Sequence, residues 1–112
     1  ASIRNNETSQ EIRNRVILAK EIQIERFIKE ESIYSNAMMP PQMVKETCLV
    51  NKAGLNLLRT AMEKLDLSAR AYDRILKVSR TIADLAESKE IRIEHLAEAI
   101  QYRSLDREGW IA

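Results

Sequence analysis

The sequence has few of the residues that build β-rich or disulfide-bonded domains. Its 112 residues include only two glycines and two prolines, and 4% are aromatic. A β-sandwich or barrel needs turn residues and strand-forming aromatics, so the composition argues against both. A single cysteine, Cys48, excludes an internal disulfide bond and fits a reducing compartment. His95 is the single histidine, and with Cys48 it provides too few ligands for a zinc site.

Long apolar runs, a charge excess and catalytic motifs are also missing. Without an apolar run of about 18 residues or a signal-peptide pattern, we expect a soluble, cytoplasmic protein with no membrane partner. The net charge of +1 gives the whole chain little attraction for nucleic acid, so any anion site must be a local patch. There is no glycine-rich phosphate loop, no Ser/His/Asp set and no metal-ligand spacing. We therefore expect the chain by itself to turn over no substrate.

What the chain does have is an abundance of helix-forming residues, with 45% hydrophobic content, enough for one core. Helix starts are indicated by the capping box Thr8–Glu11, by Pro40 and Pro41, and by the capping residues Asn51 and Ser68. A last helix is expected over "IEHLAEAIQYRS". The pattern predicts an all-α bundle of five helices that forms one domain over 1–112. The polar first residues, "ASIRNNET", lead us to expect in addition that the chain is a piece of a larger protein. Residues 1–7 are expected to be flexible and 30–40 to form a loop.

The first helix, expected to run to about Lys29, carries two apolar faces. We expect the core face to contain Ile12, Val16, Ala19 and Phe27. A second row, Ile17–Ile24–Ile28, is expected to be more exposed and to dock on a partner. Gln23 interrupts the first face and is interpreted as a core-edge amide bonded to a neighbour.

Helical spacing assigns core positions along the rest of the chain. These are Leu55, Leu58, Met62, Leu65, Tyr72, Ile75, Leu76, Ser79, Ile82, Ala83, Ala86, Leu96, Ala99 and Ile100. His95 is expected at the surface or the edge of the core, and Trp110 is expected to fold back onto the bundle. Carboxylates are interpreted as solvated helix faces, with Asp73–Lys77 and Arg80–Asp84 as i,i+4 pairs. Gly54, inside a helix, costs up to about 1 kcal/mol and has no explanation in the sequence.

The stretch "SARAYDR" contains an electrostatic conflict. Ser68 is a good N-cap, yet Arg70 follows in the first helical turn, where the positive end of the helix dipole disfavours a cation by about 0.3–1 kcal/mol. Arg74 and Lys77 add further positive charge on the face opposite the core. Free N–H groups, the dipole and a guanidinium meet at this point, which suits a phosphate oxygen. Ser68, Arg70 and Arg74 are therefore the candidate binding residues.

The segments "LSARAYDRILKVSRTIADLAESKEIRIEHLAEAIQYRSLDRE", "SQEIRNRVILAKEIQIERF" and "YSNAMM" resemble the magnesium-chelatase-like AAA+ ATPases, and within them the ComM (competence protein) subfamily. The resemblance covers nearly the whole chain and implies the helical lid that follows the nucleotide-binding core. Ile93 stands where the family pattern has a helix-starting proline, and Ser79 stands where it has alanine. Neither departure touches the "SAR" motif.

The resemblance also implies roles for residues and partners. Arg70 matches the sensor-2 arginine, which reaches the γ-phosphate of ATP, while the phosphate loop, the Walker B acid, the arginine finger and the Mg²⁺ site belong to the upstream core. It implies a ring-forming ATPase, expected to be a hexamer, acting in DNA branch migration during natural transformation. Chelatase relatives instead use ATP to insert a metal into a porphyrin. We expect the chain alone to bind ATP weakly or not at all, because it lacks contacts to the base, the ribose and Mg²⁺.

Two alternatives from other functional classes remain open. Arg70, Arg74 and Lys77 are also suitable as phosphate contacts of a helix-turn-helix DNA-binding domain, although the basic stripe is short. The row Ile17–Ile24–Ile28 is equally typical of the docking face of a helical protein-interaction module. A steep salt dependence of DNA binding would distinguish the first alternative from the nucleotide role.

Overall fold

The structure is a computed structural model that describes residues 8–107, and the side chains of residues 8–102. Its helices are α1 (Ser9–Arg26), the 3₁₀ turn η2 (Asn36–Met38), α2 (Pro41–Thr47), α3 (Lys52–Leu65), α4 (Ala69–Leu85) and α5 (Ile93–Arg107). Within residues 8–107 there is no strand, only a parallel bridge between Val50 and Ile91. The predicted all-α, five-helix architecture is confirmed. The predictions for residues 1–7 and Trp110 lie outside the described residues.

The predicted helix starts are confirmed by hydrogen bonds. Thr8 Oγ1 accepts from the N–H of Glu11 at 3.1 Å, and Asn51 Oδ1 accepts from the N–H of Gly54 at 2.8 Å. Pro41 is the first residue of α2, where its missing N–H leaves no bond unmade. Helix α1 ends at Arg26, before the predicted Lys29, and the chain turns into the loop that leads to η2.

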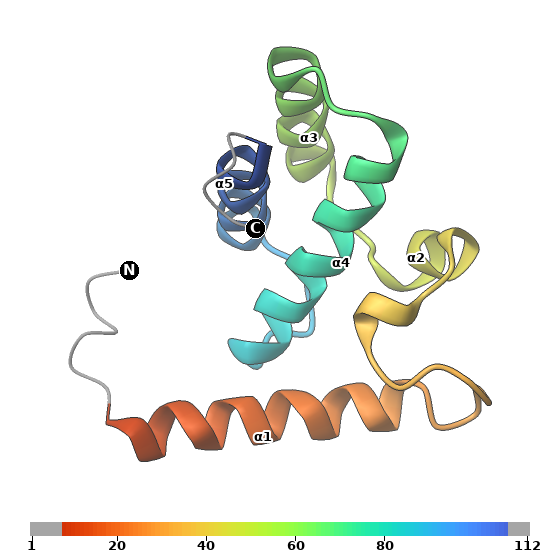
Figure 1. The fold of residues 1–112 in the computed structure, drawn as a ribbon, viewed down its shortest axis with the longest axis vertical. Helices are drawn as coiled ribbons and strands as arrows, with labels where there is room; N and C mark the ends of the chain where they lie inside the picture. The colour runs from red at the N-terminus through yellow and green to blue at the C-terminus, as the bar shows by residue number, and fades with distance from the viewer. Residues whose placement is uncertain (1–7, 108–112) are drawn as a thin grey trace.

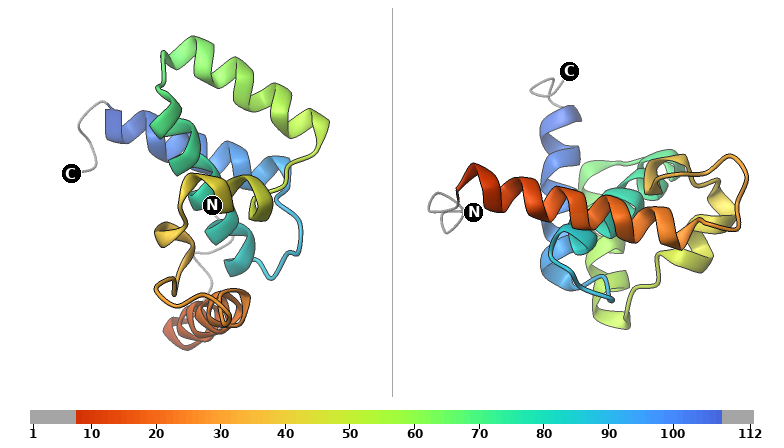
Figure 2. Two further views of the ribbon diagram at one scale, coloured as in Figure 1. Left: turned by 90° about the vertical axis from the view of Figure 1, so that its right-hand side faces the viewer. Right: turned by 90° about the horizontal axis from the view of Figure 1, so that it is seen from below.

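Helix α4 is the centre of the fold, because α5, α1, η2 and α2 all pack against it (Figure 1). Helix α3 packs on α5 on one side of the molecule, and α1 lies apart from that pair, at the far end of α4 (Figures 1 and 2). The buried apolar cluster comprises Phe27, Met39, Val44, Cys48, Leu58, Ile75, Leu76, Ala83, Ile91, Leu96 and Ala99. Tyr72, Ile82 and Ile100 pack against it, so most of the predicted core positions on α4 and α5 are confirmed.

The core prediction for α1 is only half right. Ala19 and Phe27 are buried, but Ile12 and Val16 are 43% and 39% exposed. The reason is visible in Figure 1, where the N-terminal part of α1 extends past the end of α4 and no other helix of residues 8–107 lies against it. Leu55 and Ala86 are also exposed, against prediction. Leu55 lies beside the stripe Gly54–Leu58–Ala61 that α3 buries, and Ala86 follows the last residue of α4.

The structure explains Gly54. It is buried in α3, where a Cβ atom would lie 2.7 Å from Leu96 Cδ1 of α5 and closer still to Val50 Cγ1. Glycine therefore permits the close approach of α3 to the start of α5, and this packing outweighs its low helix propensity.

Candidate functional site at the start of helix α4

The candidate site begins with the cap of α4. Ser68 has extended backbone torsions, and its Oγ accepts a hydrogen bond from the N–H of Ala71 at 3.2 Å. The preceding N–H groups, of Ala69 and Arg70, have no acceptor among the described residues. These N–H groups and the helix dipole make the start of α4 attractive to an anion.

Arg70 and Arg74 are exposed on the outer face of α4. Neither makes a hydrogen bond or an ion pair within the part of the chain that the structure describes. The prediction that Arg70 is exposed and unpaired is thus confirmed, while its contact with phosphate stays a prediction. Lys77 differs, because its Nζ donates to the carbonyl oxygen of Ala37 at 3.2 Å instead of pairing with Asp73 as predicted.

An apolar hollow adjoins this corner. It has a volume of about 790 Å³ and lies between the segment 41–50, α3 and the first turns of α4. Its lining includes Lys45, Leu55, Met62, Ala69, Tyr72 and Asp73. The hollow is lined by one face of α4, which carries Ala69, Tyr72 and Asp73. Arg70 projects from the neighbouring face, so the start of α4 places the Arg70 guanidinium beside an apolar surface.

The opposite end of α4 holds a buried charged cluster that the sequence did not predict. Asp84, interpreted as a solvated carboxylate, is 1% exposed. It accepts two hydrogen bonds from the guanidinium of Arg26 on α1, each at 2.8 Å, and forms an ion pair with Arg80 Nη2 at 3.1 Å. The Arg80–Asp84 pairing was predicted, but its burial and its link to α1 were not.

Asn36 of η2 completes this cluster and has no exposed surface. Its Oδ1 accepts from Arg26 at 2.8 Å, and its Nδ2 donates to Asp84 at 2.9 Å and to Thr81 at 3.0 Å. Its backbone N–H donates to Gln23 Oε1 at 2.9 Å, which confirms Gln23 as a bonded core-edge amide. We name Gln23, Arg26, Asn36, Arg80 and Asp84 the junction cluster, because it joins α1, η2 and α4.

Arg80 extends this cluster toward α5. Its two Nη atoms donate to the carbonyl oxygens of Lys89 and Ser88, at 2.9 and 2.6 Å, which fixes the chain just after α4. Burial lowers the pKa of Arg80 from its ordinary value, and the Asp84 carboxylate opposes that effect. Arg80 remains a cation, since an arginine side chain keeps its proton in proteins.

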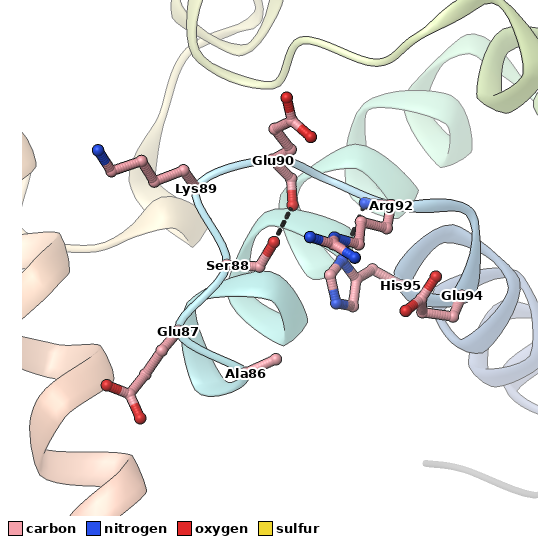
Figure 3. Close-up of a pocket in the computed structure, with 8 residues that line it drawn as sticks. All are labelled: Ala86, Glu87, Ser88, Lys89, Glu90, Arg92, Glu94 and His95. Carbon is pink, nitrogen blue, oxygen red and sulfur yellow. Dashed lines mark hydrogen bonds between the residues drawn. The ribbon is translucent and has the colours of Figure 1, made fainter.

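His95 is buried, at 6% exposure, which contradicts its predicted place at the surface or core edge. Its Nδ1 accepts from the backbone N–H of Arg92 at 2.9 Å, at the start of α5 (Figure 3). The imidazole occupies the position that Glu or Gln takes in a capping box, so one of its two ring nitrogens is hydrogen-bonded despite the burial. Burial also lowers the pKa of His95, so the ring is neutral at pH 7 and Nδ1 is free to accept.

The described residues do not suggest metal or thiol chemistry. No group of three or more His, Cys, Asp or Glu side chains among them is placed to hold a metal ion. Cys48 lies in the core, and burial raises the pKa of its thiol to about 11, so it is a packing residue at neutral pH. None of the described helices is both long and apolar enough to cross a lipid bilayer.

Comparison with known proteins identifies the class. Residues 6–103 match the family described as "Magnesium chelatase, subunit ChlI C-terminal", and the chain belongs to this family of helical domains. It is 45% identical over 101 residues to Competence protein ComM of Haemophilus influenzae, covering 90% of this chain and 19% of that protein. The chain is 37% identical to Uncharacterized protein YifB of Escherichia coli, with the same coverage. It is 30% identical to an uncharacterized protein of Mycobacterium tuberculosis, and that match covers 91% of this chain and 20% of that protein. The chain thus spans about a fifth of the length of these relatives.

Proposed function

We propose that this domain is the sensor-2 lid of a ComM-like AAA+ ATPase, in which Arg70 contacts the γ-phosphate of ATP across a cleft between lid and core. The observation that carries the proposal is an exposed cation at the start of α4, next to two N–H groups, and neither the cation nor the N–H groups have a partner among residues 8–102. Such a donor set fits a phosphate oxygen, both in charge and in hydrogen-bonding capacity. Family membership supports the same role.

Each residue of the corner has a part in this proposal. Ser68 fixes the first turn of α4 and so sets the position from which Arg70 extends. Arg70 stabilises the charge that develops on the transferred phosphoryl group, which is the usual role of an arginine in such a site. Arg74, one turn further along, contacts the same nucleotide or a neighbouring subunit. ATP, with Mg²⁺ supplied by the core, is the substrate of the complete protein.

The parent protein, in this proposal, forms a ring and uses ATP hydrolysis to drive DNA branch migration. The relative whose name refers to competence supports a role connected with DNA uptake. The upstream core is the first partner of the domain. Its docking surface on this chain is the row Ile17–Ile24–Ile28, whose side chains are 45%, 59% and 72% exposed. On the predicted core face, Phe27 is 3% exposed, whereas Ile12 and Val16, at 43% and 39%, are nearly as exposed as Ile17.

The test is Arg70→Ala in the complete protein, with Arg59→Ala as the control. Arg59 is an exposed arginine on α3 rather than on α4, so both substitutions remove one surface cation. We expect Arg70→Ala to lower ATP hydrolysis or nucleotide affinity strongly while leaving thermal stability nearly unchanged, and Arg59→Ala to change neither. Unchanged hydrolysis kinetics in an assembled Arg70→Ala ring would end the proposal. Salt-dependent DNA binding by the isolated domain that is lost in Arg70→Ala would instead favour a direct DNA contact.

A further inference from the structure

The N-terminal half of α1, residues 9–18, carries a cluster of exposed apolar side chains. Its large aliphatic residues are all exposed, and they are Ile12, Val16, Ile17 and Leu18. The first buried side chain of the helix is Ala19. In Figure 1 this half of α1 projects past the end of α4, and no other helix of residues 8–107 lies against it. Single exposed aliphatic residues are normal on a protein surface, but a contiguous cluster marks an interaction site.

These side chains point to more than one side of the helix. At about 100° per residue, Val16, Ile17 and Leu18 together span about 200° of its circumference. One flat neighbouring surface cannot cover three consecutive side chains on such an arc. The larger the apolar part of its circumference, the more of a helix is buried in the assembled protein. The N-terminal half of α1 therefore fits a groove rather than a flat surface.

Two cations among these apolar side chains define the chemistry of that groove. Arg13 and Lys20 are seven positions apart, so they lie on the same side of α1, between Val16 and Ile17. Neither makes a hydrogen bond or an ion pair within the part of the chain that the structure describes. Covering them with a purely apolar surface costs free energy, because the charges lose water and gain no partner. A groove that fits this half of α1 is therefore apolar inside, with carboxylates at the rim that faces Arg13 and Lys20.

The place of such domains in their proteins indicates what supplies the groove. The family is one of C-terminal domains, and the chain spans about a fifth of the length of its relatives. In a protein of this kind most of the polypeptide precedes the domain and is joined to it through α1. This covalent connection gives the upstream part a high effective concentration at residues 9–18, an advantage over any separate protein. The helix gains from the cover, because about ten residues of helix without tertiary contacts are marginally stable in water.

We propose that residues 9–18 insert into an apolar groove with an acidic rim on the upstream core of the same protein, which encloses α1 from the side of Ile12 to the side of Leu18. This inference rests on the proposed function for one premise, that such a core adjoins the domain. It goes further than the docking row proposed above, because it adds both flanks of the helix and the acidic partners of Arg13 and Lys20. It does not depend on the role of Arg70.

Hydrogen exchange measured by mass spectrometry tests the enclosure. The 112-residue chain and the complete protein are both measured without nucleotide, so the result is independent of ATP binding. Amides of residues 9–18 should exchange at least about tenfold more slowly in the complete protein, because enclosure suppresses fraying of the helix end. Amides of α3 are the internal control and should differ by less than about twofold. Equal exchange of residues 9–18 in the two proteins would overturn the proposal.

Leu18→Asp in the complete protein separates enclosure from docking on a single face. Leu18 points about 100° away from Ile17, so a surface that covers only the docking row leaves it in solvent. In an enclosed helix the aspartate is buried, and exchange of residues 9–18 should return close to that of the 112-residue chain. Val78→Asp on α4 is the matched control, since Val78 is 39% and Leu18 40% exposed, and it should leave this exchange unchanged. Loss of protection in Ile24→Asp but not in Leu18→Asp would overturn the enclosure and leave docking on one face.

Two further measurements test the acidic rim and the identity of the occupant. Arg13→Glu should speed up exchange of residues 9–18 in the complete protein by about threefold or more, because it places like charges opposite each other. Arg59→Glu, the same change on α3, should have no effect on this exchange, and equal behaviour of the two variants would contradict an acidic rim. The 112-residue chain should sediment as a monomer. A dimer in which exchange of residues 9–18 slows as the chain is concentrated would overturn the proposal, because a second copy would then cover α1.

Discussion

Replacing Asp84 with asparagine should remove much of the stability of the domain. The substitution keeps the shape of the side chain but removes the negative charge that faces Arg26 at 2.8 Å and Arg80 at 3.1 Å. Two guanidinium groups would then face each other in a buried site without a counter-ion. Removing one partner of a buried ion pair typically costs about 3–5 kcal/mol, because the remaining charge stays desolvated. We expect a loss in this range, which is a large part of the stability of a small domain.

Urea unfolding followed by far-UV circular dichroism measures this loss. For an m-value of about 2 kcal/mol/M, the midpoint should fall by about 2 M with little change in m. Asp73→Asn is the matched control, since Asp73 lies on the same helix but has no hydrogen bond or ion pair among the described residues. It should change stability by less than about 0.5 kcal/mol. If Asp84→Asn cost no more than Asp73→Asn, the junction cluster would not be a stabilising element.

Arg26→Lys gives an independent measure of the same cluster. It keeps a positive charge near Asp84 but cannot reproduce the two parallel hydrogen bonds of the guanidinium. The loss of stability should fall between those of Asp73→Asn and Asp84→Asn. A loss as small as the control's would show that charge alone, without the paired geometry, holds α1 on α4.

Three further predictions concern single residues. Gly54→Ala should lower the free energy of unfolding, because a Cβ atom would clash with Val50 and Leu96. The clash costs about 1–3 kcal/mol, which outweighs a gain in helix propensity of up to about 1 kcal/mol. A rise in the urea midpoint would contradict this. For His95, burial lowers the folded pKa below the ordinary 6.5, so the unfolded chain takes up the proton first as pH falls. The free energy of unfolding should therefore decrease below about pH 6.5 and level off once the folded ring is also protonated. The His95→Gln variant should lack this step. Cys48, with its pKa raised to about 11, should react with Ellman's reagent much more slowly than a free thiol at pH 8 and rapidly in urea; a fast reaction of the folded chain would contradict its burial.

Features that depend on residues close in sequence were predicted well. The caps at Thr8, Asn51 and Ser68 each join a side chain to an N–H group three positions along the chain, so the local pattern contains the whole interaction. Helical periodicity likewise identified Leu58, Ile75 and Leu96 as core residues. The exposure of Arg70 followed from the same periodicity.

The junction cluster was missed because its parts are far apart in sequence. Arg26 and Asp84 are separated by 58 positions, and Asn36 is 48 positions from Asp84. Alternation of acidic and basic residues on α4 suggested a solvated face, and nothing local indicated that α1 would cover its C-terminal end. One feature of the sequence indicated that Asp84 is buried. It directly follows Ala83, a core position of α4, and it can pair with Arg80 one turn earlier.

The exposure of Ile12 and Val16 shows a different limit. An amphipathic pattern identifies which face of a helix is apolar, but not whether the chain supplies something to cover that face along its whole length. Ala19 and Phe27 are covered by the rest of the fold, and Ile12 and Val16 are not. The length of α1 relative to the elements it packs against is set by the tertiary structure, which the pattern does not contain.

The two ends of α4 carry charges of the sign that the helix dipole disfavours. Asp84 lies in the last turn, where a cation is preferred, and Arg70 lies in the first turn, where an anion is preferred. At the C-terminal end the chain compensates internally, because Arg26 and Arg80 surround Asp84. At the N-terminal end no described residue compensates Arg70, and solvent exposure keeps the cost to about 0.3–1 kcal/mol. In our proposal the missing negative charge at Arg70 comes from outside the domain, as the phosphate of a nucleotide, and the junction cluster holds the helix from which Arg70 extends.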